Sequence, residues 1–334
     1  MQQNFIFLKK NTLNNLLNFL ISLTLGLAIL YFVFKDVDIS SYESKIVELN
    51  YSWIIFAMTI SIFEYIIRAY RWNLLLEFNN KNLTVYKTTI GLIISYLSAI
   101  ILPRINDIVR CYILSKTDKV KISVSIGSVI TERIFDVISI FLLILLLLLF
   151  EFDRFYNYLM IEVVGNAEFD FLMFLLISIL LIILIFYFII IKFFHSSNYY
   201  EKFKEKVGEL KSGMVSIFKM KKKIEFLIST IILWLLYFVV GYLIFFSMEE
   251  TSHLGLSAAL SILVAGALGT IVPVNAGIGA YHLFVASILI YYGIEYEDGL
   301  FFATILHGSQ VITILFFGLV SLVLLYLDVF RKNK

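Results

Sequence analysis

Charged side chains occur inside stretches that are otherwise apolar enough to lie within a membrane. In the run IFEYIIRAYRW, Glu64, Arg68 and Arg71 follow one another at spacings of four and three residues, so a helix would carry them on one face. An ionised side chain at bilayer depth costs ~2.5 to 3.5 kcal/mol even on mild scales and therefore needs a partner or a cavity. We expect Glu64 and Arg68 to face the interior of a helical bundle. For Arg71, extension of the side chain to the lipid headgroups is an equally good interpretation.

A second group of charges follows the first of the two prolines in the chain. Pro103 ends an apolar segment in the run LSAIILPRINDIVR, and Arg104, Asn106, Asp107 and Arg110 come directly after it. Proline breaks a membrane helix unless buried polar groups satisfy the freed backbone. Guanidinium groups bind phosphate through two donors at once, so these arginines could hold an anionic group.

Acidic side chains that could neutralise the arginines occur in the run SVITERIFDVISIF. Glu132 and Asp136 are four residues apart on one helical face, with Arg133 beside them. We predict an ion pair between Arg104 or Arg110 and one of these acids. Two interpretations remain open: a fixed lock between the two segments, or counter-charges for arginines that bind an anionic substrate.

The second proline, Pro273, precedes a run of different chemistry, VPVNAGIGAYH. Small or uncharged polar residues follow it: Asn275, Gly277, Gly279 and His282. Glycines allow close approach of a backbone or a ligand, and a helix that restarts after them directs free N–H groups toward an anion. His282 and His307 are either hydrogen-bonded packing residues or proton carriers.

The elements that must position these side chains are membrane helices. The chain is 60% hydrophobic and 16% charged, which excludes a soluble domain. Stretches long enough to cross ~30 Å of hydrocarbon are 13–34, 51–76, 123–150, 169–192, 224–246 and 299–327. Two further apolar segments, 85–115 and 255–292, carry the prolines. The sequence predicts an all-α polytopic membrane protein with a single membrane domain over residues 1–334.

The charges of the loops predict an orientation. Residues 192–223 carry nine lysines against three glutamates, whereas 151–170 carry five acids against one arginine, so we expect these loops on opposite sides. The basic linker 195–223 and both basic termini are then cytoplasmic, in a bacterial-type inner (plasma) membrane. Basic loops border 85–115 and acidic loops border 255–292, which predicts re-entrant hairpins from opposite faces.

This assignment divides the chain into two repeats, 13–150 and 169–327. Each contains two spans, a hairpin and a third span, and an odd number of spans inverts the second copy. Inverted repeats whose broken helices meet near the midplane are typical of secondary transporters. We predict that the two hairpin tips approach one another. Eight ordinary transmembrane helices without symmetry are the alternative.

Four runs together resemble the lysylphosphatidylglycerol synthase transmembrane-region family, also called flippase-like membrane proteins: RAYRWNLLL, LPRINDIVR, SVITERIFDVISIF and VPVNAGIGAYH. The resemblance covers nearly the whole chain. Asn106 and Asp107 stand where the family pattern has Gly and Glu, and His282 stands where it has a carboxylate. The resemblance implies movement of a phosphate-bearing lipid or lipid-linked headgroup between leaflets. The substrate-binding residues that we expect are Arg68, Arg71, Arg104, Asn106, Asp107, Arg110, Glu132, Arg133, Asp136, Asn275, Gly277, Gly279 and His282.

In the best-known members of that family, a separate soluble domain aminoacylates phosphatidylglycerol and the membrane part flips the product. We expect this chain, which ends at Lys334, to resemble the translocator alone and to act with a separate lipid-synthesising or glycosyltransferase partner. The sequence has no GxSxG, HExxH or Walker motif and one cysteine, so we expect no enzyme, metal, cofactor or nucleic-acid partner. A secondary transporter of a small anion is the alternative, followed by an intramembrane lipid-modifying enzyme with Glu132 or His282 as its base.

Overall fold

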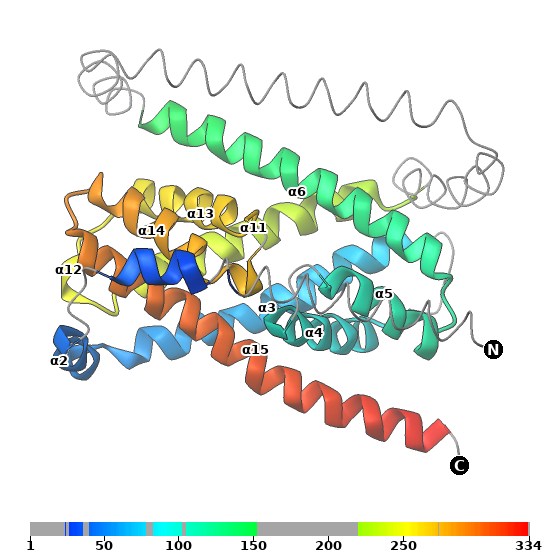
Figure 1. Ribbon diagram of the computed structural model, residues 1–334. Helices are drawn as coiled ribbons and strands as arrows, with labels where there is room; N and C mark the ends of the chain where they lie inside the picture. The colour runs from blue at the N-terminus through cyan, green and yellow to red at the C-terminus, as the bar shows by residue number, and fades with distance from the viewer. Residues whose placement is uncertain are drawn as a thin grey trace, which may run out of the picture.

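The computed structural model describes residues 24, 27–35, 40–77, 83–101, 105–151, 220–272 and 274–332. Every regular element in these ranges is a helix (Figure 1). The first half of the chain contains α2 (Ser40–Glu48), α3 (Tyr51–Leu76), α4 (Val85–Ile101), α5 (Asn106–Thr117) and α6 (Ile122–Phe150). The second half contains α11 (Lys223–Phe245), α12 (Glu249–Ser252), α13 (Leu256–Gly269), the 3-10 turn η2 (Asn275–Gly277), α14 (Ala280–Ile290) and α15 (Tyr296–Lys332). The prediction of an all-α polytopic membrane protein is confirmed.

Four of these helices are long and apolar enough to cross a membrane: α3, α6, α11 and α15. They correspond to the predicted spans 51–76, 123–150, 224–246 and 299–327, although α15 begins earlier and ends later than predicted. The start of α3 follows from Asn50, whose side chain accepts a hydrogen bond from the Ser52 backbone N–H at 3.2 Å and so caps the helix. The predicted spans 13–34 and 169–192 and the linker 195–223 lie wholly or mainly outside the described residues.

Both proline segments form helical hairpins. Helix α4 packs on α5, and α13 packs on α14. With 17 residues in α4 and 14 in α13, these helices are roughly 25 and 21 Å long, shorter than a hydrocarbon layer of ~30 Å. Hairpin α4–α5 lies toward the right of Figure 1 and α13–α14 toward the left, near opposite ends of the bundle. The re-entrant insertion of these hairpins from opposite faces stays a prediction.

The two hairpins contact one another, and the meeting of their tips near the membrane midplane stays a prediction. Helix α4 contacts the turn η2, which connects α13 to α14. The prolines themselves, Pro103 and Pro273, lie outside the described residues. Close packing within the second hairpin depends on Gly269, because a Cβ atom there would lie 2.8 Å from the Cα atom of Tyr281.

The long helices exchange partners between the two halves of the chain. Helices α3 and α11 pack side by side, α15 packs on α4, and α6 packs on α13. Two inverted repeats would produce this pattern of contacts, and the repeat boundaries 13–150 and 169–327 stay a prediction.

The interior is apolar where helices of both halves meet. Ala57 of α3, Ile244 of α11, Val285 of α14 and Phe302 of α15 belong to one buried cluster. The outward faces of α6 and α15 instead expose large apolar side chains, as in a protein whose surroundings are lipid. At one end of the bundle, Lys45 of α2 forms an ion pair with Asp298 at the start of α15.

Candidate functional site

Glu132 is the centre of a buried group of ion pairs between α3, α5 and α6. Its Oε1 accepts hydrogen bonds from Arg68 Nε at 3.0 Å and Arg71 Nη2 at 3.2 Å. Its Oε2 accepts one from Arg110 Nη1 at 2.8 Å. The Glu132 side chain has no exposed surface. One carboxylate of α6 therefore holds guanidinium groups from two other helices.

Asp136 lies one helical turn further along α6 and shares two of these arginines. It accepts a hydrogen bond from Arg71 Nη2 at 2.8 Å, and Arg68 Nη2 is 3.8 Å away. Because the Arg71 side chain is completely buried, the interpretation that it extends to the headgroups is wrong. Buried acids neutralise the charge of this guanidinium, so it has no need to reach the membrane surface.

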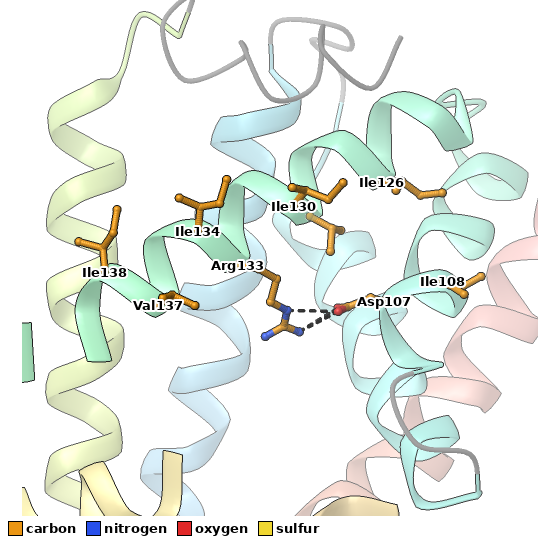
Figure 2. A pocket seen from close by; sticks show the side chains of 9 residues that line it. Asp107, Ile108, Ile126, Ile130, Arg133, Ile134, Val137 and Ile138 are labelled. Atoms are coloured by element: carbon orange, nitrogen blue, oxygen red, sulfur yellow. Dashed lines mark hydrogen bonds and ion pairs between the residues drawn. The ribbon is translucent and has the colours of Figure 1, made fainter. Parts of the chain in front are cut away.

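The outer part of the group connects α5 to α6 through Asp107 (Figure 2). Arg133 Nη2 lies 2.9 Å from Oδ1 of Asp107, and Arg133 Nε lies 3.2 Å from Oδ2. Arg110 Nη2 donates to the same Oδ1 at 2.8 Å. The Arg133 side chain is 43% exposed, whereas that of Arg110 is 2% exposed. The guanidinium groups thus form a series that begins at the exposed Arg133 of α6 and continues to the buried Arg110 of α5.

The predicted ion pair between the first hairpin and the third span is therefore present as Arg110 with Glu132. Arg104 lies outside the described residues. Asn106 is the first residue of α5, one position before Asp107.

Aromatic side chains that sequence reasoning missed surround the arginines. Tyr237 of α11 accepts a hydrogen bond from Arg68 Nη1 at 3.2 Å. The Arg110 guanidinium lies 4.7 Å from the ring centre of Trp72, whose Nε1 donates to Ser128 at 2.9 Å. A signal for Tyr237 existed, because tyrosines of membrane helices concentrate at the interfaces and this one lies in the middle of its span.

This group, which we call the arginine cluster, has one more positive charge than negative charges. Its arginines are Arg68, Arg71, Arg110 and Arg133, and its acids are Asp107, Glu132 and Asp136, a formal balance of +1. Among the described residues, the buried Nε and Nη1 of Arg71 and Nε of Arg110 have no hydrogen-bond partner. Surplus positive charge and unused donors suit an additional anionic acceptor.

A groove of about 640 Å³ runs along the outside of this cluster between α5 and α6. Asp107 and Arg133 are its charged residues, and the others are Ile108, Ile126, Val129, Ile130, Ile134, Val137 and Ile138. Figure 2 shows the Asp107–Arg133 pair beside this row of aliphatic side chains. Since the groove lies on the apolar surface of α6, it can accept a molecule with a charged end and an aliphatic end.

The other predicted residues gather at the tip of the second hairpin. Gly277 and Gly279 have φ angles of 77° and 84°, which glycine adopts without strain. The Gly279 N–H points to Nδ1 of His282 at 3.4 Å, so this ring caps the start of α14. Asn275 is buried. Among the described residues, no hydrogen bond or ion pair joins this turn to the arginine cluster.

A second histidine holds the turn in place. His307 Nε2 of α15 lies 2.9 Å from the carbonyl oxygen of Ala276. The His282 and His307 rings are 5.1 Å apart. Within the part of the chain that the structure describes, no histidine, cysteine and carboxylate side chains are grouped to hold a metal ion.

Comparison with known proteins decides the family. A family model described as the lysylphosphatidylglycerol synthase TM region matches residues 19–318. The chain belongs to this family. The match includes α3 to α6 and α11 to α14, so both the arginine cluster and the second hairpin are parts of the lysylphosphatidylglycerol synthase transmembrane region. This membership is consistent with a lipid-related role in a membrane. No curated protein and no solved structure matches the chain.

Proposed function

We propose that the protein translocates a phosphate-bearing lipid or lipid-linked headgroup between the leaflets of a bacterial-type inner membrane. The observation that carries this proposal is the groove between α5 and α6, in which Arg133 and Asp107 lie among aliphatic side chains. A lipid has the same division between a charged headgroup and apolar chains. Family membership supports the lipid class of the substrate.

In this proposal, Arg133 receives the headgroup first because it is the most exposed arginine of the cluster. A phosphate that pairs with Arg133 competes with Asp107, which now accepts hydrogen bonds from both Arg133 and Arg110. Release of Asp107 frees donors of Arg110, and the unused donors of Arg71 lie deeper in the same cluster. The headgroup can therefore advance from one guanidinium to the next while its chains stay in the apolar groove.

The two alternatives fit the site less well. A transporter of a small soluble anion needs a route closed off from lipid, whereas this groove lies on the apolar face of α6. An enzyme would need an available base, but both oxygens of Glu132 accept hydrogen bonds from arginines. The Nδ1 atom of His282 is likewise engaged by a backbone N–H group. We therefore propose a translocator that receives its substrate from a separate lipid-synthesising or glycosyltransferase partner.

A lipid-movement assay tests the proposal. Proteoliposomes would contain phosphatidylglycerol with a fluorescent acyl chain, and dithionite added outside would bleach only the outer leaflet. We expect the wild type to expose inner-leaflet lipid to bleaching and Arg133→Gln to slow this exposure. Lys116→Gln, in which α5 loses a cation outside the cluster, is the matched control and should behave as the wild type.

A parallel measurement separates lipid from soluble anion. Vesicles of the same preparation would be given radiolabelled glycerol 3-phosphate, which has a phosphate but no acyl chains. Lipid movement without glycerol 3-phosphate uptake supports the proposal. Uptake of the soluble anion without movement of the lipid would establish the alternative.

A further inference from the structure

Glu64 is a buried acid that lies outside the arginine cluster. It is 5% exposed, and its Oε1 has no hydrogen-bond partner among the described residues. Arg68 follows it by one helical turn, but that guanidinium donates instead to Glu132 at 3.0 Å and Tyr237 at 3.2 Å. The nearest cation is thus occupied elsewhere, and one carboxyl oxygen is left free.

The surroundings of Glu64 are phenols and one guanidinium. The titratable or charged groups nearest to it are Tyr65 and Arg68 of α3, Tyr96 of α4, Tyr237 of α11 and Tyr281 of α14. Glu132 and Asp136 of α6 lie on the far side of Arg68. His307 of α15 lies behind Tyr281. Glu64 therefore lies between the arginine cluster and Tyr281 of the second hairpin, which stacks on His307 of α15.

Two protonation states of Glu64 have different consequences for the arginine cluster. An ionised carboxylate here would be a fourth negative charge opposite four arginines and would make the interior neutral. Burial without a full set of hydrogen bonds makes that ionised state costly, so a neutral carboxylic acid is an accessible second state. When Glu64 is neutral, the arginine cluster keeps its one surplus positive charge, which favours a bound anion.

We propose that Glu64 is a proton-binding site linked to the anionic-lipid site, so that a lipid phosphate and a proton bind together. In this step one O–H bond forms on a Glu64 oxygen and one O–H bond of a hydronium ion breaks, which leaves a water molecule, and no other bond changes. The inference rests on the proposed function, because it takes the phosphate of the lipid to bind at the arginine cluster. Linkage is reciprocal, so bound phosphatidylglycerol must raise the proton affinity of Glu64 as much as the proton raises lipid affinity.

Linked binding would also remove the electrical cost of transport. A lipid phosphate with one negative charge and a proton add no net charge to an interior that is neutral with Glu64 ionised. The loaded protein then carries no net charge through the membrane potential. Translocation would consequently respond to a pH difference across the membrane and little to the voltage.

Proton uptake on lipid binding tests the inference. Purified protein in a nonionic detergent and a weak buffer would be mixed with phosphatidylglycerol. A pH-sensitive dye would report proton uptake, and native mass spectrometry would count bound lipid. We expect up to about one proton per lipid in the wild type, and loss of most of this uptake in Glu64→Gln with lipid binding retained. Glu225→Gln, which changes an exposed acid in the first turn of α11, is the matched control and should keep the uptake.

Infrared difference spectra provide a second readout that needs no variant. Phosphatidylglycerol added to the wild type should produce a carboxylic-acid C=O band that shifts in D2O, whereas the ester bands of the lipid do not shift. Lipid binding without this band, or unchanged proton uptake in Glu64→Gln, would overturn the inference and leave the proposed function standing. A wild type that binds no phosphatidylglycerol would overturn both.

Discussion

Arg110 and Glu132 connect the first hairpin to α6 through a hydrogen bond of 2.8 Å between two side chains with almost no exposed surface. This pair has no access to water that could replace either partner. Removal of one member leaves a desolvated charge, which typically costs ~3 to 5 kcal/mol. The pair consequently determines how the hairpin lies on α6.

Glu132→Gln should lower the stability of the protein by ~3 to 5 kcal/mol, because three arginines would lose their common counter-charge. Thermal unfolding in detergent measures this change. Asp118→Asn is the control, since its ion pair with Lys87 is partly exposed and should contribute less than ~1 kcal/mol. Equal losses of stability in the two variants would contradict the assigned role of Glu132.

Trp72→Phe should cost ~1 to 3 kcal/mol, because it keeps a ring under Arg110 but leaves the buried hydroxyl of Ser128 without its donor. Trp72→Ala should cost more, ~3 to 5 kcal/mol, since it also creates a cavity. Unfolding midpoints of the two variants and the wild type check the order. A milder effect of alanine than of phenylalanine would count against packing of Arg110 on the indole ring.

Ile130→Trp should fill the groove between α5 and α6 without changing any charge. We expect lipid binding to weaken by about tenfold or more, which corresponds to a loss of ~1.4 kcal/mol. Native mass spectrometry with phosphatidylglycerol measures the change. Leu149→Trp places the same side chain at an exposed position of α6 outside the groove and should bind lipid as the wild type does.

Gly269→Ala should destabilise the second hairpin by ~1 to 3 kcal/mol, because the added methyl group meets the backbone of Tyr281. Gly255→Ala is the matched control, since a Cβ atom there has no atom within 4 Å. Its backbone is extended with φ at −93°, so alanine should be tolerated or slightly stabilising. Unfolding measurements that rank the two variants in the opposite order would exclude close packing of α13 on α14.

Cysteine labelling tests the proposed cytoplasmic location of the termini and the basic linker. Ser252 lies in α12 and Lys221 lies just before α11, at opposite ends of that helix. In intact cells, an impermeant maleimide should label Ser252→Cys and leave Lys221→Cys unlabelled until the cells are opened. Buried Cys111 gives little background. Labelling of both positions from outside would refute the orientation.

The limits of α3, α6 and α11 could be predicted because hydropathy acts locally, whereas α15 is longer than the predicted span. Helix α3 begins at Tyr51 as predicted, after its cap Asn50, and the apolar runs of α6 and α11 determine their own lengths. An ion pair between Arg104 or Arg110 and Glu132 or Asp136 was also predictable, since a membrane interior requires opposite charges to meet, but the sequence did not decide which pair forms.

Contacts between distant elements could not be predicted in the same way. The burial of Arg71 depends on how α6 lies against α3, which no local pattern specifies. Tyr237 is 169 positions from the arginine that it contacts, and the surrounding run is uniformly apolar. The missing hydrogen-bond partner of Glu64 Oε1 among the described residues likewise depends on the pairing of Arg68 with Glu132 and Tyr237, which lie far away in the sequence.

The exchange of partners between the halves of the chain has a mechanical consequence. The first hairpin is held between α3 of its own half and α15 of the other, and α13 of the second hairpin is held between α11 and α6. Neither hairpin can tilt without pushing on a long helix that leads to the opposite end of the bundle. A tilt of either hairpin would therefore be transmitted through these helices to the opposite end of the bundle.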